Sequence, residues 1–173
     1  MVTLPFFFWL MVLIFAIIGA MRGWAKELLV TFSVILALFI LNVLGRYVGP
    51  VREIFAPESS SAAAFWIRSV VLILLVFFGY QTPNLPRVAG ARFARERLSD
   101  VLLGLVLGAL NGFLVIGTLW FFLHQADYPF RDYISPPPAD LALLGYLPPH
   151  WLGIPQIYFA MAIAFIFILV VLL

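Results

Sequence analysis

The chain contains no cysteine among its 173 residues. It therefore cannot form a disulfide, a thiolate-ligated metal site or a cysteine-held iron–sulfur cluster. Charged residues are also scarce, at 10% of the chain, whereas a soluble domain has about 25%. Hydrophobic residues instead make up 65%. This balance excludes an ordinary soluble domain and predicts an integral membrane protein.

The sequence also lacks the residue patterns that most catalytic or nucleic-acid-binding proteins need. The net charge is only +2, and the basic residues lie in short segments between apolar runs, so no nucleic-acid partner is expected. The two histidines, His124 and His150, lie at the edge of or within one loop, away from Ser33 and Ser69, which leaves no nucleophile–base pair. These histidines, with the aspartates between them, lack the spacing of a metal site. We therefore expect no enzymatic activity and no cofactor.

Five apolar runs are present instead. They cover residues 4–21, 28–44, 62–80, 101–123 and 154–173. Each run is close to the roughly 20 residues that a helix needs to cross a bilayer. The third contains Arg68, whose long side chain we expect to reach up to the lipid headgroups. The sequence thus predicts an all-α integral membrane protein with about five transmembrane helices.

Small residues mark two of these helices for close packing. The fourth run carries glycines at four-residue spacing with an amide on the same face: Gly104, Gly108, Asn111 and Gly112. The first run carries a second small-residue stripe: Ala16, Gly19, Ala20 and Gly23. Such stripes allow two helix backbones to approach closely in a membrane. We therefore expect the first and fourth helices to pack against each other.

Polar residues within the spans have two interpretations. Asn42 and Asn111 are expected to hydrogen bond across helix interfaces, and the alternative is a polar ligand site between the second and fourth helices. A proton relay would need ionisable groups at mid-depth, whereas Glu27 and Asp100 are predicted at the membrane edges. Ser99 or Asp100 is expected to cap the fourth helix.

The basic residues indicate an orientation. The first and third loops hold six of them: Arg22, Lys26, Arg87, Arg92, Arg95 and Arg97. The second and fourth loops hold Arg46, Arg52 and Arg131, or four with Arg68. Because positive residues favour the cytoplasmic side, we expect the N-terminus outside and the C-terminus inside. The third-loop cluster of Arg87, Arg92, Arg95 and Arg97 is either this topology signal alone or also a site for anionic lipid or an acidic partner.

The segment after the fourth span is rich in proline and aromatic residues. We expect it to form a stiff, extended cover on the outer interface. Its aromatic residues are candidates for docking another polypeptide: Tyr128, Phe130, Tyr133 and Trp151. The alternative is a simple tether, whose aromatics form an ordinary belt at the headgroups.

Two stretches suggest a family. Arg22-Gly23-Trp24-Ala25-Lys26-Glu27, and Leu98-Ser99-Asp100 ahead of the glycine stripe, resemble the colicin V production protein family over residues 4–123. The family motif residues matched are Arg22, Gly23, Glu27 and Asp100. Two arginines of the family pattern are replaced here by Val101 and Asn111. The resemblance implies a four-span membrane domain at 1–123, to which a proline- and aromatic-rich external loop at 124–153 and a fifth helix at 154–173 are added.

The resemblance also implies a function class. Members of this family are bacterial inner-membrane proteins linked to colicin V production or export and to envelope physiology, without established catalysis. The first hypothesis is therefore a non-catalytic protein that acts in export or envelope maintenance through contacts with lipid and with other membrane proteins or its own copies. The second is an accessory subunit of a larger assembly, such as a respiratory or photosynthetic complex. A channel or small-solute transporter is a distant third.

Overall fold

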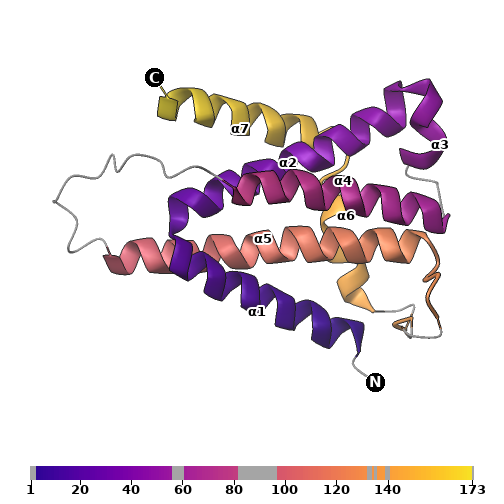
Figure 1. Cartoon of the computed structure of the whole chain (residues 1–173), viewed down its shortest axis with the longest axis horizontal. Coiled ribbons are helices and arrows are strands. Elements are labelled where there is room, and N and C mark those ends of the chain that lie inside the picture. The colour runs from indigo at the N-terminus through magenta and orange to yellow at the C-terminus, as the bar shows by residue number, and fades with distance from the viewer. Residues whose placement is uncertain are drawn as a thin grey trace.

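The computed structural model describes residues 3–55, 61–81, 97–131, 134, 136–138 and 141–172. All of the regular structure in these residues is helical, which confirms the all-α prediction (Figure 1). The helices are α1 (Leu4–Arg22), α2 (Trp24–Tyr47), η1 (Gly49–Val51), α3 (Arg52–Phe55), α4 (Ala62–Tyr80), α5 (Arg97–Gln125), η2 (Ala142–Tyr146), α6 (Pro148–Trp151) and α7 (Gln156–Leu172).

Four of the described helices, α1, α2, α4 and α5, are long and apolar enough to cross a membrane. They alternate in direction along the chain (Figure 1). The fifth, α7, has 17 residues and is shorter than these four. It runs antiparallel to α2, because Tyr158 meets Phe39 near its start and Phe167 meets Phe32 near its end. The chain is therefore a multi-pass membrane protein with four long spans and a shorter fifth apolar helix.

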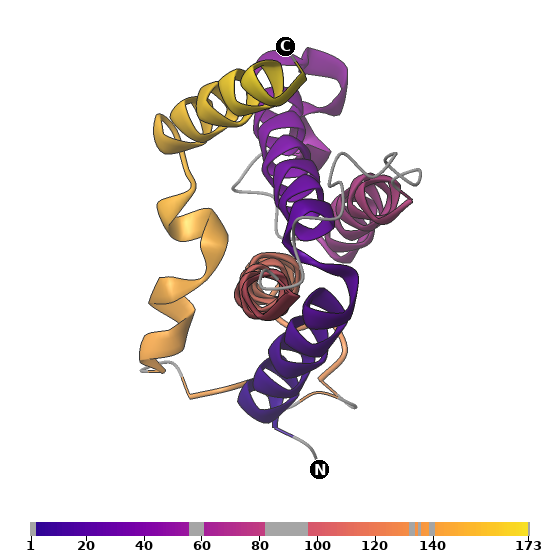
Figure 2. The same cartoon turned by 90° about the vertical axis from the view of Figure 1, so that its left-hand side faces the viewer.

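The helix α5 occupies the middle of the molecule. Figure 2 looks nearly along its axis and shows α1, α2 and α4 on one side and the segment with η2 and α6 on the other. The residues of α2 that face this arrangement follow helical spacing, with Val30, Val34 and Leu41 buried. They share a hydrophobic cluster with Leu72 of α4 and Val115 of α5. The core therefore lies between α2, α4 and α5.

The small-residue faces of α1 and α5 are in direct contact. A Cβ atom built on Gly19 would lie 2.2 Å from the Gly104 carbonyl oxygen, and one on Gly108 would lie 2.4 Å from the Phe15 carbonyl oxygen. One on Gly112 would lie 2.7 Å from the Phe15 side chain. Only glycine allows backbones this close. On α1, Ala16 is buried with Gly19 on this face.

Ala20 and Gly23 complete the stripe predicted on α1 and differ in burial. Ala20 is half-buried. Gly23 is buried and follows the last residue of α1. The close contacts with α5 therefore extend along α1 from Val12 to Gly23.

The segment after α5 is not the extended cover expected from its prolines. Within its described residues it forms η2 and α6, and it packs against the chain's own helices. Leu144 and Leu147 join a cluster with Phe8 of α1. A Cβ on Gly117 would lie 2.7 Å from the Pro148 ring. Gly117 is six residues inside the end of the uncharged run, or about 9 Å along the axis, so α6 reaches down beside α5.

Arg68 also differs from its expected place. It is 3% exposed, and its side chain points into the bundle instead of reaching up to the headgroups. Its Nε donates to the Ile54 carbonyl oxygen at 3.0 Å, and its Nη1 donates to Gln125 Oε1 at 2.8 Å. A buried guanidinium is stable only when its N–H donors are hydrogen bonded. Ile54 and Gln125 provide acceptors inside the bundle, so the side chain does not need to reach water at the headgroups.

Candidate functional site: a buried polar cluster at the α1–α2 turn

The turn between α1 and α2 brings two charged residues of the family motif together. Gly23 has a φ of 85°, a backbone conformation that favours glycine, and it lets α2 begin directly after α1. Arg22 Nη1 then donates to Glu27 Oε1 at 2.7 Å. The Glu27 side chain is fully buried and that of Arg22 is 20% exposed. The prediction that Glu27 lies at a membrane edge therefore misses its burial between helices.

The amide of Asn111 joins α5 to this pair. Its Nδ2 donates to the backbone oxygen and to Oε2 of Glu27, both at 2.9 Å. Its Oδ1 accepts from Thr31 Oγ1 at 2.7 Å. Both amide protons and the carbonyl oxygen are therefore used, as expected for a cross-helix packing bond. Asn42 behaves differently from expectation, because its Nδ2 donates to the Leu38 carbonyl oxygen of its own helix at 2.9 Å.

Tyr80 connects α4 to the same cluster. Arg22 Nη2 donates to the Tyr80 carbonyl oxygen at 3.2 Å. The Arg22 guanidinium carbon also lies 4.3 Å from the centre of the Tyr80 ring, in cation–π range. The Tyr80 hydroxyl is buried with no hydrogen-bond partner among the described residues. The polar cluster, defined as Arg22, Glu27, Thr31, Tyr80 and Asn111, thus ties four helices together.

Asp100 fixes the start of α2 and not the start of its own helix. Its Oδ1 accepts from the backbone N–H of Trp24 at 3.0 Å, where α2 has free donors. The expected capping of α5 by Ser99 or Asp100 is wrong, because α5 begins earlier, at Arg97. A Cβ on Gly23 would lie 2.8 Å from Asp100 Oδ1. Glycine at position 23 therefore both allows the backbone conformation of the turn and leaves room for the Asp100 carboxylate.

Residues that the sequence did not single out also belong to the cluster. Thr31 lies four residues after Glu27, so the helical period places both on the face that meets α5. That spacing was a usable signal. No sequence signal identified Tyr80, because it contacts Arg22 through its ring face and its backbone oxygen. The family motif residues Arg22, Gly23, Glu27 and Asp100 all lie at this turn.

The candidate docking residues lie in different environments. Tyr128 is 4% exposed and its hydroxyl accepts from Trp120 Nε1 at 3.3 Å, so its ring is not available to a partner. Burial raises the pKa of the Tyr128 phenol, the Trp120 hydrogen bond lowers it, and Asp127 raises it further. Phe130 is half-buried beside Phe65, and Trp151 is exposed. Tyr133 lies outside the described residues.

The predicted basic cluster lies almost wholly outside the described part of the chain. Arg87, Arg92 and Arg95 are not described, and Arg97 is described only as the first residue of α5. Within the described residues, no group of three or more histidine, aspartate or glutamate side chains is placed to hold a metal ion. In the polar cluster, the Glu27 carboxylate accepts hydrogen bonds from Arg22 and Asn111 and so links helices together.

Of three comparisons with known proteins, one gives a match. No curated protein matches the chain. No solved structure matches it either. The family model for the colicin V production protein matches residues 4–136, beyond the 4–123 predicted, so the first part of the segment after α5 is included. Since this match covers most of the chain and contains the motif residues at the α1–α2 turn, the protein belongs to the colicin V production protein family.

Proposed function

We propose that this chain is a non-catalytic protein of the bacterial inner membrane that acts in export or envelope maintenance through protein–protein contacts. Membership of the colicin V production protein family supports a role in export or envelope maintenance. The polar cluster supports a non-catalytic role. Glu27, Arg22 and Asn111 engage one another across α1, α2 and α5. Polar groups that are used in this way stabilise a helix arrangement and are not free for substrate.

The surface proposed for these contacts is the exposed part of the segment after α5. Trp151 is exposed, and its indole N–H donates to the Tyr146 carbonyl oxygen at 3.1 Å, which fixes the ring orientation. Phe130 contributes a half-buried ring. A rigid aromatic side chain loses little entropy on binding and provides a large contact area. Membrane lipid and other membrane proteins, or further copies of this chain, are the partners proposed.

The test combines rescue with crosslinking in a bacterial strain that lacks its own member of the family. Expression of the chain should restore colicin V production or envelope integrity. A photoreactive residue at Trp151 should crosslink to a discrete protein, whereas one at Phe78, an exposed lipid-facing residue of α4, should not. Rescue without any protein crosslink at Trp151 would contradict the docking surface. A fixed, stoichiometric set of partners on purification would instead indicate an accessory subunit of a larger assembly.

The proposed orientation places the N-terminus outside and the C-terminus in the cytoplasm. It rests on the excess of basic residues in the first and third loops. In this orientation the α1–α2 turn and the polar cluster lie toward the cytoplasm, and the segment after α5 lies toward the outside.

A further inference from the structure

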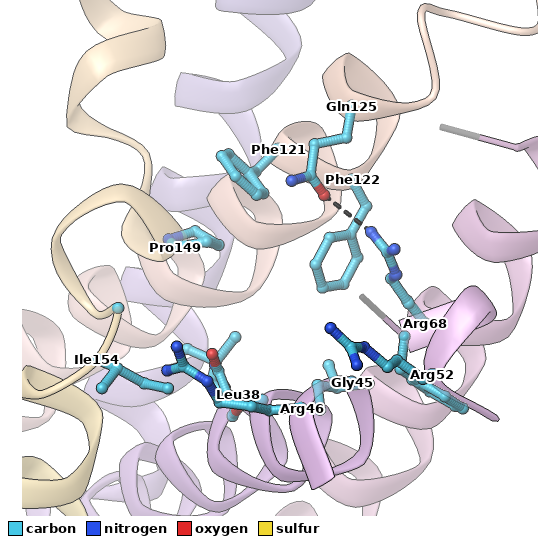
Figure 3. Close-up of a pocket in the computed structure, with 14 residues that line it drawn as sticks. Leu38, Gly45, Arg46, Arg52, Arg68, Phe121, Phe122, Gln125, Pro149 and Ile154 are labelled. Atoms are coloured by element: carbon cyan, nitrogen blue, oxygen red, sulfur yellow. Dashed lines mark hydrogen bonds between the residues drawn. The ribbon is translucent and has the colours of Figure 1, made fainter. Parts of the chain in front are cut away.

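A cavity of about 350 Å³ lies at the end of the bundle where α2 and α5 end. Its wall comes from α2, α3, α4, α5, α6 and the segment that joins α6 to α7 (Figure 3). Three of its lining residues are arginines, Arg46, Arg52 and Arg68. None of the described lining residues is an aspartate or a glutamate. The cavity is therefore bounded by positive side chains.

Arg68 forms a fixed part of this wall. Its hydrogen bonds to the Ile54 carbonyl oxygen and to Gln125 Oε1 hold the guanidinium between α3, α4 and α5. Figure 3 shows the bond to Gln125 at the edge of the cavity. Its guanidinium carbon also lies 5.9 Å from the Phe122 ring centre. Arg68 therefore contributes positive potential from a position that does not need a ligand to be stable.

Arg46 and Arg52 are placed differently. Both are exposed, and neither forms a hydrogen bond or ion pair with another described residue. Figure 3 shows their guanidinium groups beside the cavity, across from Phe122 and Gln125. Each guanidinium has five N–H donors, in a geometry that matches the oxygens of carboxylate and phosphate groups. These two residues are therefore the donors that an anionic ligand would use.

The helix ends near the cavity reduce this positive charge without cancelling it. The C-termini of α2 and α5 each carry about half a negative charge, and the N-terminus of α4 carries about half a positive one. Together they amount to roughly half a negative charge. Arg46 and Arg52 alone carry two full positive charges, before Arg68 is counted. The balance favours an anion.

The rest of the lining is apolar. Leu38, Leu41, Phe55, Phe121 and Ile154 form this part of the wall. We propose that the cavity binds the phosphate of a headgroup whose overall charge is negative, as in an anionic phospholipid. Arg46 and Arg52 bind the phosphate oxygens, and the apolar wall contacts the hydrocarbon beside them. A free phosphate ion shares the charged chemistry but makes no use of the apolar wall.

The experiment measures lipid binding to the full, delipidated chain in detergent by native mass spectrometry. Phosphatidylglycerol, which is anionic, is compared with phosphatidylcholine, whose headgroup is neutral overall. Wild type should bind phosphatidylglycerol in preference to phosphatidylcholine. The R46Q/R52Q double variant should bind phosphatidylglycerol at least about tenfold more weakly than wild type, because both guanidinium groups that donate charged hydrogen bonds to the phosphate are removed. Both substituted residues are exposed, so folding is unaffected, and circular dichroism verifies this.

The matched control is R131Q, which removes one positive charge from an exposed residue that does not line the cavity. This variant should bind phosphatidylglycerol as wild type does. Inorganic phosphate is then added as a competitor: displacement of the lipid assigns recognition to the phosphate alone, and retention assigns it to the phospholipid. Equal binding of the two lipids by wild type, or an equal loss in R131Q and in the double variant, would overturn the site.

Discussion

Glu27 is the residue on which the polar cluster depends, because both Arg22 and Asn111 donate hydrogen bonds to it. Its two carboxylate oxygens accept from Arg22 and Asn111, and its backbone oxygen accepts from Asn111 and lies 3.1 Å from Thr31 Oγ1. Thr31 has a single hydroxyl proton, so its shorter contact, 2.7 Å to Asn111 Oδ1, is the favoured one. Removing the carboxylate charge would leave Arg22 without its counter-charge in a membrane.

Glu27→Gln should therefore lower the free energy of unfolding by about 3 kcal/mol, the lower end for breaking a buried ion pair, because Arg22 keeps some solvent contact and its bond to Tyr80. The glutamine amide also presents N–H donors to groups that are themselves donors. Unfolding in mixed detergent micelles, followed by circular dichroism, measures the change.

The matched control for this ion pair is Asp127→Asn. Asp127 pairs with Arg131 four residues later, and their side chains are 80% and 59% exposed. An exposed pair contributes less than about 1 kcal/mol, so this variant should unfold nearly as wild type does. Equal destabilisation by the two substitutions would show that burial of Glu27 has no energetic consequence.

At the scale of single residues, the sequence predicted a hydrogen bond between helices but not the burial of two charged side chains. The cross-helix bond of Asn111 was predictable because an amide on a glycine-lined helix face must meet a neighbouring backbone. The burial of Glu27 and Arg68 was not. Charged residues near helix ends usually reach water, and only the position of facing helices decides whether they turn inward. That position comes from tertiary packing, which the local sequence does not contain.

At the scale of elements, the contact between α1 and α5 organises the bundle. The apolar face of a membrane helix gains little from leaving lipid, so close packing must supply the attraction. Gly19 on α1 fits between Gly104 and Gly108 on α5, and the backbone atoms themselves come into contact. Both stripes could be read from residue spacing, because a missing side chain is a local property. The pairing of α1 with α5 could then be predicted, since two small-residue faces allow the closest approach of two helices.

Gly108→Leu should destabilise the fold by about 1 to 3 kcal/mol, because a Cβ at this position would lie 2.4 Å from the Phe15 carbonyl oxygen and a backbone atom cannot rotate away. Val106→Leu is the control, two residues along the same helix at a position that is 61% exposed. The thermal midpoint of each variant in detergent, compared with wild type, tests the difference. If the two variants melt together, the glycine face is not a packing surface.

The segment after α5 was the least predictable element. Its prolines indicate stiffness, but they do not say which way the chain turns. The turn itself uses left-handed backbone at Asp127 and Tyr128, with φ values of 53° and 52°. Non-glycine residues rarely adopt this conformation, and burial of the Tyr128 ring helps to stabilise it here. Sequence composition therefore identified the segment as distinct without revealing that α6 packs beside α5.

At the scale of the whole molecule, the orientation of the chain decides which side of the membrane each end and the arginine-lined cavity face. The structure changes how the basic residues are counted. Arg22 is ion-paired within the polar cluster, and Arg68 is buried between helices, so neither is a loop charge. Removing one from each side reduces six against four to five against three. The excess therefore still favours the first and third loops as cytoplasmic.

The orientation can be tested at two exposed residues that flank opposite sides, Gln81 at the end of α4 and Asp127 after α5. The chain has no cysteine, so each single-cysteine variant can be labelled without background, and wild type is the blank. In intact spheroplasts an impermeant maleimide should label Asp127→Cys and should reach Gln81→Cys only after lysis. The opposite pattern would reverse the orientation and place the arginine-lined cavity at the cytoplasmic leaflet. Labelling of both variants in intact spheroplasts would mean that α5 does not separate the two sides.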